Sequence, residues 1–212
     1  MDYIGVSEWQ KIFAAWKATM RANRDYLITL DGVAGDSDLG LTMTDGFAAA
    51  SASADAFSGD DVGMLLYHAG KAIMSNAPSS LGTLLGSGFL EAGRRLKGKQ
   101  ELPIRDAGQF FEAIEDNIMQ RGHSAVGDKT FLDGIDPAVQ TLKSDAIWKE
   151  GWSNALRLAA EAAEAGAENT KSLVAKHGRM AVRGEQSIGM LDPGAVVASL
   201  MVRAFYRALT EE

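Results

Sequence analysis

Three aspartates stand within eight residues in the stretch LDGVAGDSDLGLTM, residues 30–43. Asp31, Asp36 and Asp38 are interspersed there with glycines, which disfavour a helix and permit tight turns that bring separated side chains together. Converging carboxylates repel one another unless a cation neutralises them, and Mg²⁺ prefers oxygen ligands, which it shares with phosphates and water. The spacing therefore predicts a loop that binds Mg²⁺, with an acidic surface loop as the alternative.

Composition narrows the classes of protein to consider. A chain of 212 residues can bury a full core and fits one domain over residues 1–212. Its 21 basic and 28 acidic side chains give a net charge of −7, which argues against nucleic-acid binding. The absence of cysteine excludes disulfides, thiol catalysis and zinc–thiolate sites. Without a signal-peptide pattern or an apolar run of membrane-spanning length, we expect a cytoplasmic protein that does not enter a membrane.

Apolar residues recur at three- and four-residue steps along most of the chain, which predicts helices and no strands. A capping box of Ser7 and Gln10 is expected at the start of the first helix. Capping signals for later helices are Asp60 or Asp61, Asp106, Asp136-Pro137 and Asp192-Pro193. The predicted class is all-α, an antiparallel bundle or barrel of about eight helices joined by short connections.

Three further connections carry functional residue types. They contain Ser79-Ser80-Leu81-Gly82, Gly127-Asp128-Lys129-Thr130, and the segment from Gly178-Arg179 to Asp192-Pro193-Gly194. Alternate connections of an antiparallel bundle lie at the same end, so we expect these three and the aspartates to share one rim. Helix N-termini offer unpaired amides and a positive dipole end, which suit phosphate oxygens. This coincidence favours the Mg²⁺ site over an ordinary acidic loop.

Four motifs occur in a characteristic order: LDxxxGDxDxGxxM, GDKTFLD (residues 127–133), Gly178-Arg179, and GEQSIGMLDPGA (residues 184–195). With them, essentially the whole chain resembles the nucleotide-binding L subunit of the dihydroxyacetone kinases (DhaL-like, a DAK2-type domain). The resemblance implies an eight-helix barrel that holds ADP or ATP with two Mg²⁺ ions at one rim.

The same resemblance implies roles for individual residues. The metal ligands would be Asp31, Asp36 and Asp38. The residues under the phosphates or beside the nucleotide would be Leu39, Gly40, Leu41, Thr42, Ser80, Leu81, Gly82, Thr130 and Phe131. Arg179 and the turn Asp192-Pro193-Gly194 would complete the pocket, with Arg179 as a clamp on the phosphates.

The implied reaction is phosphoryl transfer to a short ketose, in which positioning and charge neutralisation carry most of the catalysis. Asp31, Asp36, Asp38 and Arg179 would be its catalytic groups. The resemblance implies a separate K subunit that binds the ketose, because this chain lacks that domain. The phosphoryl donor would be free ATP, or a phosphohistidine protein of the sugar phosphotransferase system acting on bound ADP. Association of the chain into a homodimer stays open.

Several positions depart from the family pattern. Leu39 stands where a histidine is usual, Gln186 where an arginine is expected, and Met190 where a histidine follows. None of these changes removes a proposed Mg²⁺ ligand. They leave a second hypothesis, a non-catalytic ADP- and Mg²⁺-binding module that signals nucleotide state to a partner protein. Lys129 is as consistent with a phosphate contact as with an exposed lysine at a helix start.

Overall fold

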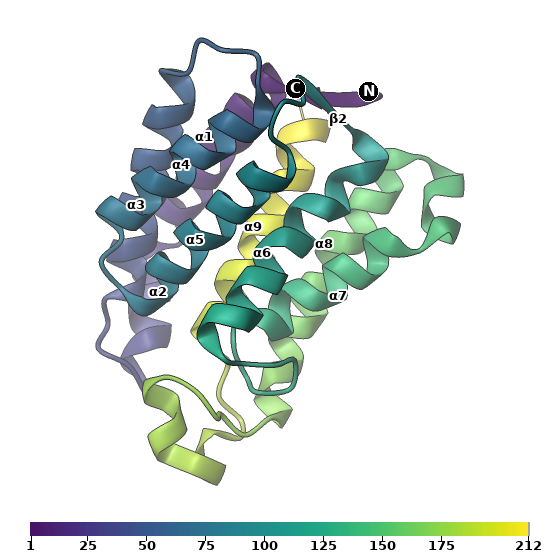
Figure 1. Ribbon diagram of the computed structural model, residues 1–212. Coiled ribbons are helices and arrows are strands. Elements are labelled where there is room, and N and C mark those ends of the chain that lie inside the picture. Colours follow the sequence, from purple (N-terminus) through teal and green to yellow (C-terminus); the bar gives the residue numbers. More distant parts are fainter. Residues whose placement is uncertain (212) are drawn as a thin grey trace.

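The computed structural model describes residues 1–211, most of which form α-helices (Figure 1). The α-helices are α1 (Val6–Ala22), α2 (Arg24–Gly32), α3 (Leu39–Asp55), α4 (Val62–Asn76), α5 (Ser80–Arg95), α6 (Ala107–Gly122), α7 (Phe131–Lys143), α8 (Trp152–Asn169) and α9 (Pro193–Thr210). Short 3-10 helices are η1 (Ile104–Asp106), η2 (Asp145–Glu150), η3 (Thr170–Ser172) and η4 (Arg179–Ser187). The all-α class is confirmed.

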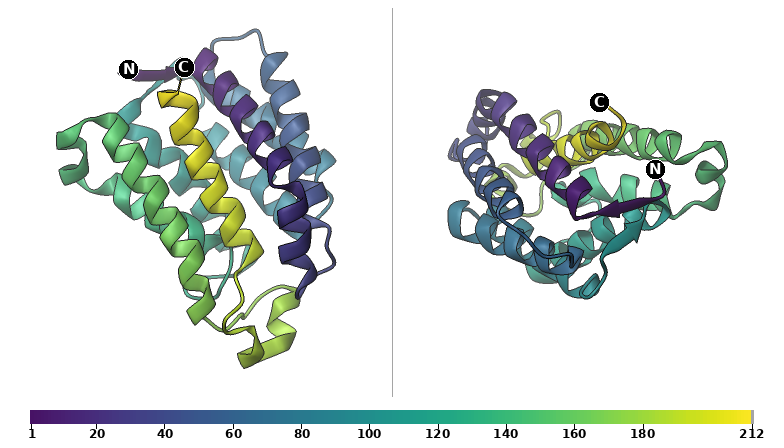
Figure 2. Two further views of the ribbon diagram at one scale, coloured as in Figure 1. Left: turned by 180° about the vertical axis from the view of Figure 1, so that it is seen from behind. Right: turned by 90° about the horizontal axis from the view of Figure 1, so that it is seen from above.

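The long helices form a closed ring. α1 packs against α3, each helix from α3 to α8 packs against the next, and α9 lies between α8 and α1. The view from above in Figure 2 shows this arrangement, with the helices around a common interior. Within residues 1–211, none of the helices combines the length and the apolarity that a membrane crossing requires.

Two features of the fold were not predicted. The strands β1 (Tyr3–Gly5) and β2 (Glu101–Pro103) pair antiparallel near the chain termini, and each has only three residues, which is too short for a recognisable alternating pattern in the sequence. Helix α2 is the other, and it brings the described part of the chain to nine α-helices. It arises because the helical run breaks at Asn23, whose side-chain amide donates to the Thr19 carbonyl at 2.9 Å.

Two predicted helix starts are wrong because stronger caps lie nearby. The first helix begins before Ser7, and the Glu8 carboxylate accepts the Gly5 N–H at 3.0 Å. α7 begins at Phe131, because the Asp133 carboxylate accepts the Thr130 N–H at 2.7 Å and completes a capping box.

Pro137 consequently lies inside α7 rather than at its start. The predicted caps at Asp61 and Asp192 are confirmed, since each side chain accepts a backbone N–H of the first turn.

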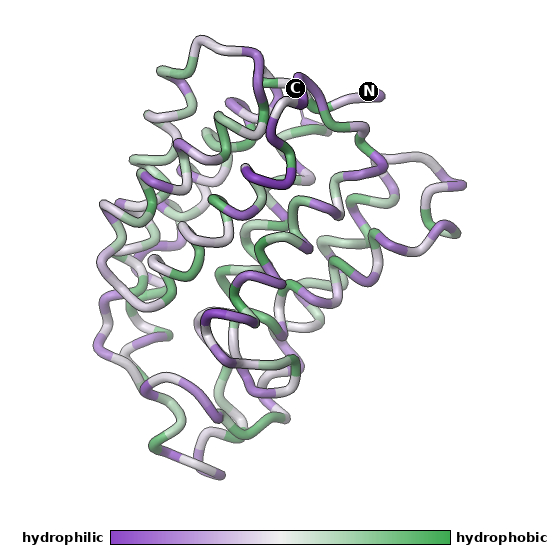
Figure 3. The backbone as a smooth tube through the Cα atoms, viewed as in Figure 1, coloured by the Kyte–Doolittle hydropathy of each residue, from purple (hydrophilic) through white to green (hydrophobic). Residues whose placement is uncertain are grey.

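Aromatic side chains fill the interior of the ring. Trp16 is completely buried, and the centroid of its ring lies 5.5 Å from that of the Phe89 ring and 5.8 Å from that of the Phe110 ring. Its indole N–H donates to the Met201 carbonyl at 2.8 Å, so the polar atom of this large side chain is satisfied. Along the helices, hydrophobic and hydrophilic residues alternate at helical spacing (Figure 3), as expected for one buried face and one exposed face.

Candidate functional site

The aspartate-bearing connection and the three further connections of the predicted rim meet at the end of the barrel opposite the chain termini (Figure 1). Between them lies a cavity of about 970 Å³, lined by residues from the α2–α3, α4–α5, α6–α7 and α8–α9 connections. The predicted common rim is therefore present. We call the opening of this cavity the mouth.

Four helices begin at the mouth. Leu39 of α3, Ser80 of α5, Phe131 of α7 and Pro193 of α9 are the first residues of their helices, and all four line the cavity. The up-and-down path of the chain produces this, since every second helix starts at the same end. The positive dipole ends of four helices surround one cavity, and this favours binding of an anion such as a phosphate.

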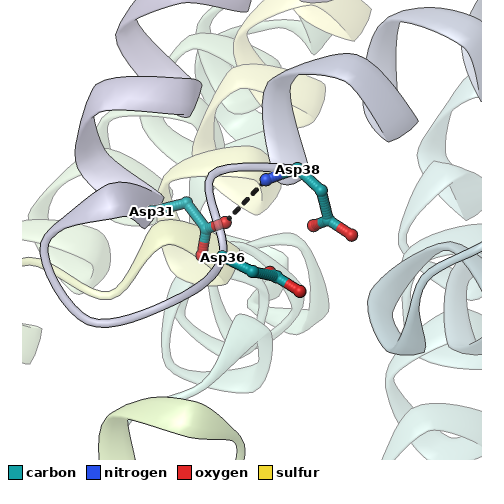
Figure 4. A group of neighbouring side chains, drawn as sticks. All are labelled: Asp31, Asp36 and Asp38. Carbon is teal, nitrogen blue, oxygen red and sulfur yellow. Dashed lines mark hydrogen bonds between the residues drawn. The ribbon is translucent and has the colours of Figure 1, made fainter.

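The three aspartates line the mouth, and Figure 4 shows that their side chains lie close together around the α2–α3 connection. Asp31 belongs to the last turn of α2, Asp36 to the connection, and Asp38 directly precedes α3. The predicted loop is thus shorter than residues 30–43, because both of its ends are helical. One oxygen from each carboxylate lies within 4.8 Å of the other two, which is close enough for them to share a cation.

The backbone of the connection holds this arrangement. The Asp38 N–H donates to Asp31 Oδ2 at 3.2 Å, so the two carboxylate-bearing residues are tied together. Gly35 N–H donates to the Asp31 carbonyl at 2.6 Å. A Cβ at Gly35 would stand 2.1 Å from Asp31 Oδ1, so no larger residue fits without moving the carboxylate.

The charges of the aspartates are only partly compensated. Arg179 forms an ion pair with Asp36 at 2.5 Å. Burial raises the pKa of Asp38, and the negative charges of Asp36 and Asp31 raise it further. A carboxylate held beside two others in this way is stabilised by a divalent cation with oxygen preference. The donor set therefore fits Mg²⁺.

Most residues that the sequence singled out line the cavity, and some do not. Those that line it are Asp31, Asp36, Asp38, Leu39, Ser80, Leu81, Thr130, Phe131, Arg179, Asp192, Pro193 and Gly194. Gly40, Leu41, Thr42 and Gly82 are not among the lining residues.

The positions of these four residues show why. A Cβ at Gly40 would lie 2.1 Å from a backbone carbonyl of α2, and one at Gly82 would lie 2.2 Å from the Ala77 carbonyl. Both glycines therefore permit close packing of backbone beside the mouth. Leu41 is 42% exposed on the outer side of α3, whereas Thr42 is buried and donates to the Leu39 carbonyl.

Asp192 is the buried carboxylate of the mouth. Its Oδ1 accepts the Ala195 N–H at 2.7 Å and caps α9. Burial raises the pKa of Asp192 to about 7, and the nearby charge of Asp133 contributes in the same direction. A carboxyl group with this pKa changes its charge near neutral pH, and Asp192 lines the cavity at the start of α9.

Sequence reasoning gave no site role to several lining residues, which are Ala34, Gly35, Pro78, Thr83, Leu84, Ile118, Arg121, Gly122, Ser124, His177 and Met180. Ser79, Lys129 and Gly178 also line the cavity, and the sequence placed these three in the connections of the predicted rim. Leu84 and Ile118 fall on the apolar faces of their helices, so periodicity alone predicts them in the core rather than at a cavity. Arg121 could have been found, since it lies in the last turn of a helix that ends at the predicted rim.

A family model described as the DAK2 domain matches residues 33–207. The PEP-dependent dihydroxyacetone kinase, ADP-binding subunit DhaL, of Escherichia coli (strain K12) is 32% identical over 187 residues, which cover 88% of this chain and 89% of that protein. The D-erythrulose kinase of Mycolicibacterium smegmatis is 33% identical over 94% of this chain and 35% of its own length.

Among solved structures, the fold is similar to that of the dihydroxyacetone kinase of C. freundii, with a TM-score of 0.72 and 22% identity. The similarity covers 93% of this chain and 34% of the C. freundii chain, so this chain spans about a third of that protein. A structure of the same kinase in complex with AMP-PNP and Mg²⁺ matches with a TM-score of 0.71.

Proposed function

Because the chain belongs to the DAK2 domain family, as a DhaL-like member of the kinase (phosphotransferase) class, we propose that it is the ADP/ATP- and Mg²⁺-binding subunit of a short-ketose kinase of the dihydroxyacetone type. One observation carries the proposal: three carboxylates within 4.8 Å of one another stand at a cavity onto which four helix N-termini open. Carboxylates and helix N-termini side by side suit a nucleotide's phosphates together with their metal.

Asp31, Asp36 and Asp38 would hold the metal, and we propose two Mg²⁺ ions. Three carboxylates supply a charge of −3 in a partly buried setting, and two divalent cations more than offset it. Bound there, Mg²⁺ would supply charge neutralisation for the terminal phosphates during in-line transfer.

The remaining lining residues would bind the nucleotide. A cavity of about 970 Å³ is large enough for it, since small-molecule sites commonly occupy roughly 300–1,000 Å³. The backbone amides at Ser80 and Phe131, the first residues of α5 and α7, suit the phosphates, and the apolar side chains of Leu84 and Ile118 suit the base. Arg179, whose guanidinium already faces the aspartates, would clamp phosphate oxygens.

The acceptor would come from a partner subunit, and the donor from a partner protein or from free ATP. The E. coli relative is by name a subunit and PEP-dependent. By analogy we propose that a separate K subunit holds the ketose over the mouth. In the first version of the proposal, ADP stays bound and is rephosphorylated by a phosphohistidine protein of the sugar phosphotransferase system. In the second, free ATP exchanges at the site.

A binding module without turnover is the second candidate. Leu39 favours it, because this buried apolar side chain lines the cavity directly beside Asp38 where the family usually has a histidine. The two candidates share the nucleotide site and differ in whether any partner elicits transfer.

The first experiment measures ADP binding by titration calorimetry with and without MgCl₂. We expect Asp36→Asn and Asp38→Asn each to abolish the Mg²⁺-dependent part of binding while leaving helicity, followed by circular dichroism, intact. Asp45→Asn is the matched control, because Asp45 is exposed on the same helix α3. Wild-type binding in both site variants would remove these carboxylates from the site.

The second experiment combines the chain with candidate K subunits, short ketoses and either ATP or a phosphoenolpyruvate-fed phosphotransferase system. Formation of ketose phosphate supports the kinase subunit, and the donor that supports turnover decides between the two versions. Mg²⁺-dependent ADP binding without transfer in any combination supports the binding module instead.

A further inference from the structure

Lys129 is buried at the start of α7, with an exposed fraction of 1%. Its backbone has φ = +62°, a left-handed conformation that few residues other than glycine adopt. The ammonium donates to three backbone carbonyls, those of Leu173 at 3.2 Å, Ser187 at 2.5 Å and Met190 at 2.8 Å. An ammonium has three donors, so all of its hydrogen-bonding capacity is used within the protein.

The three carbonyls belong to one segment, residues 173–190, which we call the flap. It connects α8 and η3 to α9, contains the 3-10 helix η4 and no α-helix, and lies beyond the open end of the barrel (Figure 1). Leu173 begins the flap, and Ser187 and Met190 end it. The Lys129 ammonium therefore ties the two stems of the flap to each other and to the barrel.

Neighbouring contacts reinforce the same attachment. Asp128 accepts from Lys176 Nζ at 2.7 Å and lies 3.2 Å from His177 Nε2. Within the flap, the Ala175 N–H donates to Ser187 Oγ at 2.9 Å.

The far side of the flap reaches the aspartates. Arg179 pairs with Asp36 at 2.5 Å, and the Arg183 guanidinium donates to the Val33 carbonyl. The flap is thus held to the barrel at its stems by a buried cation and at its tip by a charged pair beside the proposed metal ligands.

We propose that Lys129 is a positioning residue, whose ammonium holds the flap across the mouth so that Arg179 faces the bound phosphates. This inference rests on the proposed function for the identity of the ligand. It assigns Lys129 no phosphate contact, because a lysine that turned toward the cavity would abandon three carbonyls in a buried setting, and unpaired buried acceptors are costly.

The experiment is a double-mutant cycle on ADP affinity in MgCl₂, with the variants Lys129→Met and Arg179→Met and their combination. Because charge-assisted hydrogen bonds to the phosphates are lost in each case, we expect each single variant to weaken ADP binding about 10-fold or more. If Lys129 acts through Arg179, the double variant binds no more weakly than the weaker single variant. Additive losses would overturn the proposal and indicate an independent phosphate contact.

Hydrogen exchange of the apo protein gives a readout that does not depend on nucleotide. We expect Lys129→Met to accelerate exchange at the amides of Ala175 and Gly189, which are bonded at the stems, and to leave those in the middle of α8 and α9 unchanged. Unchanged exchange in the flap would overturn the positioning role while leaving the proposed function intact. If wild-type protein shows no Mg²⁺-dependent ADP binding, the proposed function fails, and with it the part of this inference that concerns phosphates.

Two further variants serve as a control and as a substitute test. Lys171→Met is the control, since Lys171 is an exposed lysine next to the flap that pairs with Glu168, and we expect less than a twofold change. Should Lys129→Met fail to fold, Ser187→Ala loosens the same stem without removing a buried charge. Its effect on ADP affinity must then be non-additive with Arg179→Met, and additivity would again overturn the proposal.

Discussion

The interior of the barrel and its mouth differ in the kind of group that is buried and in the effect of that burial on stability. In the interior, Trp16, Phe89 and Phe110 are completely buried and pack ring against ring. At the mouth, Asp38 and Asp192 have raised pKa values because burial disfavours their charges. Apolar burial stabilises a fold, whereas partial burial of like charges costs stability. The interior therefore stabilises the fold, whereas the carboxylates of the mouth lower its stability and are the groups to which we assign ligand binding.

The largest expected effect comes from opening the interior. Trp16→Ala should lower the free energy of unfolding by about 3–5 kcal/mol, because removing a buried aromatic leaves a cavity that its neighbours fill only in part. Urea denaturation followed by circular dichroism measures the change. Trp152→Ala, at the half-buried start of α8, should cost clearly less. Equal losses in the two variants would contradict the larger contribution to the free energy of unfolding that we expect from the completely buried aromatic side chains.

The wall formed by α4 and α5 should be the next most sensitive region. A Cβ at Gly93 would lie 2.6 Å from the Gly63 carbonyl and 2.7 Å from the Tyr67 amide nitrogen, both backbone atoms. Gly93→Ala must push the two helices apart, and we expect a loss of about 1–3 kcal/mol in the free energy of unfolding.

Gly108→Ala is the matched control for this wall. Its added methyl would meet a side-chain atom of Leu142 at 3.1 Å, and the gain in helix propensity of up to about 1 kcal/mol opposes the crowding. We expect a change near zero in urea denaturation. A Gly93 variant as stable as the Gly108 variant would show that the wall adapts more easily than its backbone contacts suggest.

The sequence was sufficient for the architecture because the interior follows simple periodicity. Trp9, Phe13 and Trp16 recur at helical spacing and are all buried, and the capping aspartates Asp61 and Asp192 mark helix starts correctly. The start of α7 was missed because a prolyl residue inside a helix resembles one at its beginning. Only the competing capping box of Thr130 and Asp133 separates the two cases.

The contacts of the mouth were harder to predict from the sequence, because its residues contact others that are far away in the chain. The glycines Gly40 and Gly82 match nucleotide motifs but meet backbone of neighbouring segments. Lysine is rarely buried, so the spacing around Lys129 could not show that its ammonium lies among carbonyls 44 to 61 residues away. The rim itself was predictable, because it depends only on the alternation of helix directions.

One buried carboxyl group, that of Glu115 in α6, tests whether the barrel tolerates a buried charge. Burial raises the pKa of Glu115 to about 8, and Asp136 contributes through its charge and a shared hydrogen bond, while Lys143 opposes the shift. A carboxyl whose pKa is raised in the folded state stabilises the fold at low pH, and this stability is lost as pH rises toward 8.

Glu115→Gln should therefore resemble the wild type below about pH 4.5 and exceed it by about 1–2 kcal/mol at pH 9. Urea denaturation across this pH range measures the difference. Glu112→Gln is the control, because Glu112 is a more exposed residue of α6 paired with Lys143 at 2.8 Å, and it should show no comparable rise. A difference in stability that does not change with pH would mean that the surroundings of Glu115 accommodate its charge.

The smallest effect concerns the mouth without ligand. Asp38 caps no backbone N–H with its side chain, and burial and its neighbours raise its pKa. Its ionisation therefore lowers stability as pH rises. In EDTA at pH 7, Asp38→Asn should be slightly more stable than the wild type, within about 0.5 kcal/mol, and this gain should vanish at pH 3.

With MgCl₂ and ADP at 100 times the dissociation constant, the order should reverse, because the wild type gains about 2.7 kcal/mol from binding and the variant does not. Thermal and urea unfolding in the two buffers measure both signs. A variant that is clearly destabilised in EDTA would show that the Asp38 carboxylate supports the fold itself. In that case the charged groups of the mouth would stabilise the fold, as the apolar groups of the interior do.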